Sequence, residues 1–313
     1  MNKFKDKEEI KSTIDELFIN VENFRETENF QGMLNFISSF RYLSPYNAFL
    51  VYQQKPGTKY VMNATQWYKK YGRKIKPNAR PLIILMPFGP VDYVYDISDT
   101  YSEKSQDSLF GENDDILENL IAPYKTLGYE PIKELGILEY SMRIQGISLN
   151  TDFKVGNGYA GKIEVVRDYV PQLEFRYKNT TIRYPANYIL SVRDGVTAGE
   201  MFATIVHELG HLFCHHLFAR PIGSWNVRNI DHVSTEFEAE TVSCIVCKRM
   251  DIYTPSENYL YEYYCEHKKI PDVSIETIFT ASNFILRMID GISIKEGNLY
   301  KKDENFKKLI NSL

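Results

Sequence analysis

The chain has 313 residues, of which 43% are hydrophobic and 25% are charged, and its formal net charge at pH 7 is −4. This composition is ordinary for a soluble globular protein, and the length is sufficient for two domains with their own cores. A membrane protein is not expected, because no apolar run approaches the length of a spanning helix. The charged residues from Met1 to Glu9 lack the apolar core of a signal peptide, so we expect a cytoplasmic protein.

The four cysteines agree with a reducing compartment, because no export signal accompanies them. Two of them form the pair Cys244-x-x-Cys247, which we interpret as two small buried residues on one helix. A metal or redox pair is the alternative interpretation.

The first hundred residues predict helices followed by a small β element. Apolar residues at helical spacing indicate one amphipathic helix over residues 10–24 and a second over residues 30–37. A third helix is predicted between Ser44-Pro45, with proline at its first position, and Pro56-Gly57. Two apolar runs around a Pro/Gly turn indicate a hairpin over residues 81–97.

The same region carries an uneven charge. No Asp or Glu lies between Gln31 and Val91, whereas nine cations do, and such segregation suggests an anionic partner. These cations are Arg41, Lys55, Lys59, Lys69, Lys70, Arg73, Lys74, Lys76 and Arg80.

Aromatic side chains interleave with the cations between Tyr60 and Lys74. Cations neutralise phosphates and aromatic faces stack on exposed bases, so this composition is typical of a site for single-stranded DNA. A solvated basic face over a Trp/Tyr core is the alternative, and the residues alone do not decide between the two. The candidate DNA-binding residues are Lys69, Lys70, Arg73, Lys74, Trp67 and Tyr68.

A polar stretch from Ser98 to about Asn119 predicts a linker or an insertion. We therefore expect a domain boundary near residue 112. The two expected domains are residues 1–112 and residues 113–313.

Beyond this boundary the chain predicts a helix over residues 117–127 and then three β-rich segments. The segments cover residues 144–149, 162–168 and 181–192. The last of them is our candidate for an edge strand that holds an extended peptide by backbone hydrogen bonds.

The sequence Val206-His207-Glu208-Leu209-Gly210-His211 matches the pattern H-E-x-x-H. On a helix, residues four apart lie on one face, so His207 and His211 can direct two imidazoles at one metal ion with Glu208 beside them. Two imidazoles and one further ligand leave the fourth tetrahedral position of a zinc ion for water. The adjacent carboxylate can take the proton of that water, because zinc brings its pKa to about 7.

The flanking residues predict the helix that this motif requires. Thr197-x-x-Glu200 forms a capping box and Ala219-Arg220-Pro221 a stop signal, so we expect a helix over residues 198–218 that is buried on one side. The alternative is that His207 and His211 are ordinary polar residues of an amphipathic helix. That alternative gives no reason for an acid beside the first of two histidines at this spacing.

Other histidines are poor candidates for the third zinc ligand. His215 continues the spacing, but it lies about 12 Å from His207 along the helix axis, whereas zinc–nitrogen bonds are about 2 Å long. We expect His215 to be packed, with a contact to substrate as the alternative. His216 and His232 are expected to be ordinary histidines.

The next helix offers a better third ligand, because Glu236 and Glu240 are four residues apart and share a face. We predict that Glu236 binds zinc and that Glu240 hydrogen-bonds the free nitrogen of a ligand histidine. A surface acid is the alternative for Glu240. Glu238 lies on the opposite side and is expected to complete a capping box with Thr235.

These residues resemble a known family. His207 to His215, followed by Glu236-Phe237-Glu238-Ala239-Glu240, resemble the ImmA/IrrE zinc peptidases, in which H-E-L-G-H is followed by E-x-x-A-N/D. Glu240 at the last position is similar to ArdC-type antirestriction proteins. Four N-terminal segments also resemble ArdC, in that family's order: Ser44 to Leu50, Gln53 to Pro56, Trp67 to Arg73 and Tyr95 to Thr100.

The resemblance implies an α+β chain with an N-terminal module for single-stranded DNA and a C-terminal zincin-like metallopeptidase domain, braced by helices around residues 259–268 and 274–289. His207, His211 and Glu236 would hold one zinc ion, and Glu208 would move the proton during hydrolysis of a peptide or protein substrate. The alternative is an antirestriction protein that protects DNA, in which zinc is structural. A regulatory protein that removes a partner would combine both activities.

Overall fold

The computed structural model describes residues 26–86, 89–102, 130–153, 160–166, 172–177, 180–219 and 225–291. The chain divides into two compact units, the first with Met1–Phe24 and Asn29–Thr126, the second with Arg25–Glu28 and Leu127–Leu313. Helices and small sheets occur in both, which confirms the mixed α+β class. The helices expected over residues 10–24 and 117–127 and the boundary expected near residue 112 lie outside the described residues.

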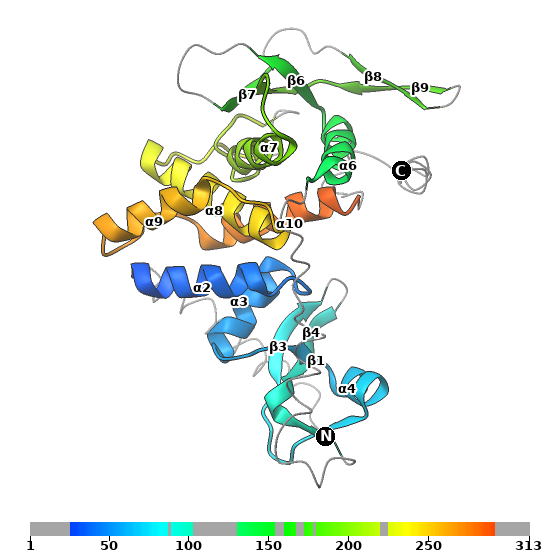
Figure 1. The fold of residues 1–313 in the computed structure, drawn as a ribbon, viewed down its shortest axis with the longest axis vertical. Helices are drawn as coiled ribbons and strands as arrows, with labels where there is room; N and C mark the ends of the chain where they lie inside the picture. The colour runs from blue at the N-terminus through cyan, green and yellow to red at the C-terminus, as the bar shows by residue number, and fades with distance from the viewer. Residues whose placement is uncertain are drawn as a thin grey trace. The chain divides into compact units, whose positions relative to one another are not determined.

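The first unit contains a small antiparallel sheet, preceded by helices (Figure 1). Strand β4 lies between β1 and β3, and β2 pairs with β5. The predicted hairpin is confirmed as β3 and β4, and Ser44 caps the predicted third helix. The elements are α2 (Thr27–Ser39), α3 (Pro45–Gln54), β1 (Val61–Met62), α4 (Ala64–Tyr71), β2 (Arg73–Ile75), β3 (Leu82–Met86), β4 (Gly89–Asp96), η2 (Ile97–Asp99) and β5 (Thr100–Ser102).

Trp67 of α4 lies in the core of the first unit and is 0% exposed. Its ring packs with Met62 and Ile97, and its indole N–H donates a hydrogen bond to the carbonyl of Tyr95 at 2.8 Å. The prediction that Trp67 contacts DNA is therefore wrong, because the core covers both faces on which a base would stack.

Arg73 of β2 is also buried, at 4% exposure. Its guanidinium donates hydrogen bonds to the hydroxyl of Thr100 at 2.6 Å and to the carbonyl of the same residue at 3.1 Å. The prediction that Arg73 binds DNA is wrong for this reason: its charge is directed into the β2–β5 pair, away from any phosphate.

Asp96 connects the chain before β1 to η2 and is 1% exposed. Its carboxylate accepts hydrogen bonds from the backbone N–H groups of Lys59 at 3.0 Å and Tyr60 at 3.1 Å, and from the N–H and hydroxyl of Ser98. The ammonium of Lys55 lies 3.5 Å away. Burial acts to raise the pKa of Asp96, but these hydrogen bonds and the charge of Lys55 lower the pKa on balance.

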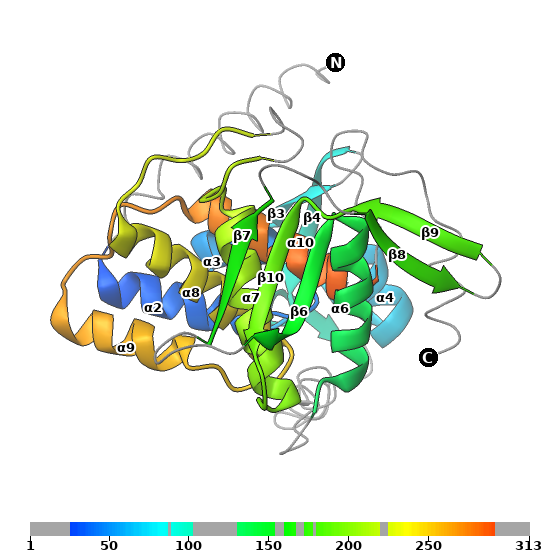
Figure 2. The same ribbon diagram turned by 90° about the horizontal axis from the view of Figure 1, so that it is seen from above.

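The second unit places a three-stranded sheet over helix α7, and α8 packs on the other side of α7 (Figure 1). Strand β10 is central, parallel to β6 and antiparallel to β7 (Figure 2), while β8 and β9 form a separate hairpin. The elements are α6 (Ile132–Ile144), β6 (Ile147–Phe153), β7 (Gly161–Val165), β8 (Gln172–Tyr177), β9 (Thr180–Pro185), β10 (Tyr188–Arg193), α7 (Ala198–Phe213), α8 (His232–Arg249), α9 (Ser256–Glu266) and α10 (Ile275–Ile289).

Two of the expected β segments differ in the structure. The segment over residues 144–149 begins as the last residue of α6, and β6 starts only after Gly146, whose φ of 74° ends the helix. The segment over residues 181–192 is two strands, β9 and β10, with different partners. Its predicted role as an edge strand is wrong, because β10 is hydrogen-bonded on both sides. Among the described residues, β7 is an edge strand of this sheet, and it contacts α7.

Helix α7 begins where the sequence predicts and ends earlier. The capping box is confirmed: the N–H of Glu200 donates to the hydroxyl of Thr197, and the Glu200 carboxylate accepts from the N–H of Thr197. The expected end near residue 218 is wrong. The helix stops at Phe213, because His215 adopts the left-handed region with a φ of 63°.

Helices α7 and α8 approach closely at Gly210. A Cβ atom on this residue would lie 3.1 Å from Cα of Ala239 and 3.3 Å from its carbonyl oxygen, so the absence of a side chain permits the contact. The second half of α8 is buried, including Cys244 and Cys247, whose pKa values burial raises to about 11 and about 12. This pair therefore fits the expected buried, unreactive thiols.

Replacing Asp96 by Ala is expected to lower the free energy of unfolding of the first unit by about 3 kcal/mol, because the N–H groups of Lys59, Tyr60 and Ser98 all lose their acceptor. Since the pKa of Asp96 is lower in the folded state, its stabilisation is present above about pH 4 and is lost as the pH falls through the folded pKa. Urea unfolding followed by tryptophan fluorescence measures both effects. Asp92→Ala is the control, because the hydrogen bond that this carboxylate accepts from the N–H of the adjacent Tyr93 is exposed to solvent and joins no distant segments. Equal losses of unfolding free energy in the two variants would contradict the prediction.

Replacing Gly210 by Ala is expected to destabilise the second unit by about 1–3 kcal/mol, because the backbone atoms of α8 that meet the new methyl group cannot rotate away. Gly199→Ala in the same helix is the matched control, since no atom lies within 4 Å of its Cβ position. This control should stabilise by up to about 1 kcal/mol through helix propensity. Thermal unfolding of both variants measures the two changes in stability. A Gly210→Ala protein as stable as the Gly199→Ala control would refute the close contact between α7 and α8.

Candidate metal centre

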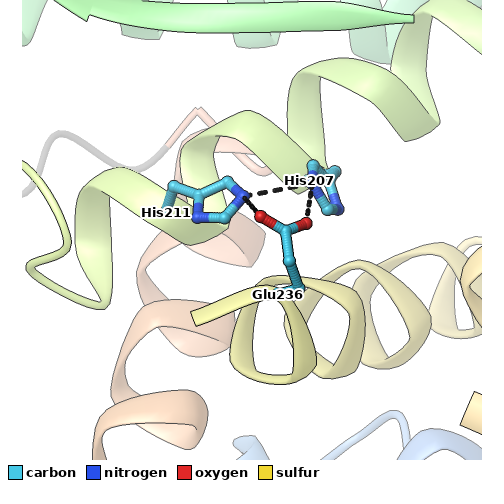
Figure 3. Close-up of side chains that lie close together, drawn as sticks. All are labelled: His207, His211 and Glu236. Carbon is cyan, nitrogen blue, oxygen red and sulfur yellow. Dashed lines mark hydrogen bonds and ion pairs between the residues drawn. The ribbon is translucent and has the colours of Figure 1, made fainter. Parts of the chain in front are cut away.

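Two histidines of α7 and one glutamate of α8 direct their side chains at one point (Figure 3). The Nε2 atoms of His207 and His211 lie 3.2 Å apart. One carboxylate oxygen of Glu236 lies 3.7 Å from Nε2 of His207, and the other lies 3.5 Å from Nε2 of His211. The structure thus brings together the three residues that the sequence predicts as ligands.

These separations fit a tetrahedral metal ion. Ligand atoms about 2.0–2.1 Å from zinc, at tetrahedral angles, are about 3.3 Å from one another. The 3.2 Å between the two Nε2 atoms lies near this value, and a different oxygen of Glu236 approaches each imidazole, at 3.5 and 3.7 Å. Two imidazoles and one carboxylate are also a donor set of catalytic zinc sites, in which a fourth position stays open. The residues present therefore suit a divalent metal ion.

The second nitrogen of each histidine has a partner. Nδ1 of His207 lies 3.6 Å from a carboxylate oxygen of Glu240, and the side chain of Ser256 also hydrogen-bonds the Glu240 carboxylate. Nδ1 of His211 lies 3.0 Å from Nδ1 of His216. Partners of this kind fix the tautomer and the orientation of a ligand imidazole. Glu240 therefore lies where the sequence places it.

Burial and neighbouring charges set the protonation of the two imidazoles in opposite ways. Burial acts to lower the pKa of His207, but the carboxylates around it, first Glu240, raise the pKa on balance. Burial and neighbouring histidines lower the pKa of His211 to about 2. His211 is therefore neutral at physiological pH, which is the form that binds a metal ion.

Glu208 lies on α7 beside the first histidine and is 8% exposed. Burial raises its pKa to about 7; the charge of His207 opposes this shift and the charge of Glu236 adds to it. A carboxyl group with a pKa near neutrality can both accept and donate a proton at physiological pH. A divalent cation at the adjacent group would favour the ionised form.

The edge strand β7 runs against α7 next to Glu208. A Cβ atom on Gly161 would lie 2.5 Å from Cγ2 of Thr204 and 3.5 Å from Oε1 of Glu208, so only glycine permits this approach. The backbone N–H of Ile163 also hydrogen-bonds the Glu208 carboxylate. In the part of the chain that the structure describes, an edge strand therefore lies directly beside the buried acid.

Glu238 does not complete a capping box with Thr235, and that prediction is wrong. Helix α8 begins at His232, and its cap is Asp231, whose carboxylate accepts a hydrogen bond from the N–H of Ser234 at 2.9 Å. Glu238 lies well inside the helix and is 0% exposed.

The buried carboxylate of Glu238 joins three segments of the second unit. It accepts hydrogen bonds from the guanidinium of Arg228 and from the backbone N–H of Ser274 at 2.7 Å, and one oxygen lies 2.9 Å from Nε2 of His216. These partners lower its pKa, although burial opposes them. The expectation that His216 is an ordinary histidine is therefore wrong. An acid on a helix side that is otherwise apolar was the one sequence signal for this cluster.

The remaining histidines near the motif lie outside the ligand group. The ring of His215 stacks on Trp225 at 5.2 Å between centroids, which fits the expected packing role. His232 is 85% exposed, with Nδ1 lying 3.6 Å from Glu236.

The cations of the first unit have different environments. Lys55 is paired with Asp99 at 2.8 Å, and Lys76 donates to the carbonyl of Ser98 at 2.8 Å. The candidate DNA-binding residues that stay exposed at the end of α4 and on β2 are Tyr68, Lys69, Lys70 and Lys74, which we call the α4–β2 patch.

No helix among the described residues is long and apolar enough to cross a membrane. Comparisons with protein-family models, with curated proteins and with solved structures found no match to this chain. Function therefore has to be argued from the side chains and their geometry.

Proposed function

We propose that this chain is a zinc-dependent metallopeptidase whose second unit has a zincin-like fold. The observation that carries the proposal is the convergence of His207, His211 and Glu236 within reach of one metal ion, with the buried acid Glu208 immediately after the first histidine. The resemblance of these residues to ImmA/IrrE and ArdC proteins supports it. Zinc is favoured because two imidazoles and a carboxylate with an open fourth position suit it.

In the proposed reaction, His207, His211 and Glu236 would hold zinc, which would supply a Lewis acid to acidify water and polarise a carbonyl oxygen. Glu208 accepts a proton from water, and the water oxygen forms a bond with the carbonyl carbon as the C=O π bond opens and leaves its electron pair on the carbonyl oxygen. Glu208 then passes the same proton to the leaving nitrogen as the C=O π bond re-forms and the C–N bond breaks. Bound zinc would favour the ionised form of Glu208, which is the form that accepts the proton.

The position of β7 supports an extended peptide as the substrate. Among the described residues, β7 pairs only with β10. Apart from the N–H of Ile163, which hydrogen-bonds Glu208, its other edge therefore offers backbone groups to one more strand. Gly161 brings this edge against α7 beside Glu208. A peptide added to β7 would therefore present its carbonyl groups close to the proposed base.

Replacing Glu208 by Gln should leave zinc bound and lower the rate of peptide hydrolysis by about 10²–10⁴-fold, because the amide cannot accept the proton. Hydrolysis of a fluorescently labelled unfolded protein and zinc content by elemental analysis give the two readings. Glu262→Gln, an exposed acid of α9, is the control and should keep full activity. A Glu208→Gln protein that cleaves as fast as this control would refute the assignment of the base.

A second candidate function is binding of single-stranded DNA by the first unit. It is favoured by the α4–β2 patch, which combines three exposed lysines with the exposed ring of Tyr68. Tyr101, opposite Lys74 on β5, adds a second partly exposed aromatic ring. In this alternative the metal ion is structural, and DNA binding does not depend on Glu208.

Replacing Lys69, Lys70 and Lys74 together by Ala should weaken single-stranded DNA binding and reduce the slope of log K against log salt by about 2, since each lost phosphate contact contributes about 0.7. Fluorescence anisotropy of a labelled oligonucleotide over a salt series measures this. Removing three exposed cations of the second unit, Lys133, Lys268 and Arg287, changes the net charge equally and is the control. Equal slopes in the two triple variants would exclude the patch as a DNA site.

A further inference from the structure

A chain of buried polar groups leads away from His211 on the side opposite the ligand group. Nδ1 of His211 lies 3.0 Å from Nδ1 of His216, and Nε2 of His216 lies 2.9 Å from an oxygen of Glu238. Both oxygens of Glu238 also accept from Arg228, one of them at 2.8 Å. The side chains of His216 and Glu238 are 4% and 0% exposed.

The direction of each hydrogen bond in this chain follows from its two ends. Glu238 is ionised between the guanidinium of Arg228 and the N–H of Ser274, so it only accepts, and Nε2 of His216 must donate to it. A neutral His216 then has a bare Nδ1, which accepts from Nδ1–H of His211. The remaining lone pair of His211 is on Nε2, the atom that faces His207 and Glu236.

The same cluster is a poor second metal site. Sγ of Cys214 lies with His216 and Glu238 in a group that could hold an ion. However, both oxygens of Glu238 are engaged by Arg228, whose positive charge would repel a second cation. Both nitrogens of His216 are also engaged, one by His211 and one by Glu238. The geometry therefore suits a hydrogen-bonded chain better than coordination.

We propose that His216, held by Glu238 and Arg228, is the positioning residue of His211: it fixes the Nδ1–H tautomer and directs Nε2 toward the metal ion. This inference rests on the proposed function only in requiring a metal ion at His207, His211 and Glu236. The carboxylate of Glu240 positions His207 directly, whereas the carboxylate of Glu238 acts on His211 through the imidazole of His216.

The hydrogen-bonded series from His211 through His216 to Glu238 also connects the proposed metal ligand His211 to the packing of the second unit. Ser274, whose N–H donates to Glu238, is the cap of α10, and Arg228 belongs to the loop between α7 and α8. The carboxylate on α8 therefore holds the end of α7, this loop and the start of α10 at once. Such support from rigid elements reduces the freedom of the ligand imidazole.

The first test uses the wild-type protein and needs no substitution. In the zinc-loaded protein, ¹⁵N–¹H spectra of the six histidine rings should show His216 with a proton on Nε2 and none on Nδ1, and His211 with a proton on Nδ1. His216 protonated on Nδ1, or His211 bound to zinc through Nδ1, would overturn the proposal. A protein that takes up no zinc at the group would overturn the proposed function, and this inference with it.

The second test compares three variants by zinc affinity, measured in competition with a chelating dye. His216→Leu removes both hydrogen bonds and should weaken zinc binding about 10–100-fold. His216→Gln keeps one acceptor and one donor and should recover much of that loss. His267→Gln, an exposed histidine of the second unit, is the control and should bind as wild type does.

Cobalt spectra and circular dichroism separate positioning from folding. The absorption bands of the cobalt-loaded protein should shift in His216→Leu and stay near their wild-type positions in His216→Gln, while both metal-free variants keep the wild-type circular dichroism. A folded His216→Leu protein with wild-type zinc affinity would overturn the positioning role alone and leave the proposed function standing. If His216→Leu does not fold, the ring tautomers of the wild-type protein and the affinity of His216→Gln decide.

Discussion

The close approach of α7 and α8 at Gly210 is the contact on which the arrangement of the second unit depends. A residue without a side chain on α7 faces Ala239 on α8, so the helix axes can come near enough for Glu236 to reach the two imidazoles. The same contact brings Glu240 to the far side of His207 and Glu238 under the end of α7. One turn of α8 thereby supplies three carboxylates: Glu236 and Glu240 approach His207 through its two nitrogens, and Glu238 contacts His216.

Local sequence signals predicted the parts of this site that lie within one helix. The Thr197–Glu200 box, the H-E-x-x-H spacing and the shared face of Glu236 and Glu240 all depend on contacts a few residues apart, and the structure has each of them. The end of α7, the order of the strands and the partners of Glu238 depend on residues far apart in the chain. Periodicity carries no information about such contacts, and the corresponding predictions were wrong or missing.

In the first unit, amino-acid composition likewise predicted only part of the structure. The stretch around α4 is rich in cations and aromatic rings, but composition does not tell which of them the sheet will bury. Trp67 faces the core and Arg73 is directed into the β2–β5 pair, whereas Tyr68, Lys69 and Lys70 lie outside. Some basic and aromatic residues of this segment are therefore buried and stabilise the fold, and only the exposed ones could contact a nucleic acid.

The central claim is that one metal ion is bound by two imidazoles and a carboxylate, and X-ray absorption at the zinc edge tests it most directly. The account predicts a site with two imidazole nitrogens and oxygen ligands, all about 2.0–2.1 Å from the ion, and no sulfur. A sulfur at about 2.3 Å would instead place the ion at Cys214, and a chain that holds no zinc would leave no metal chemistry to explain. Either result would contradict the account.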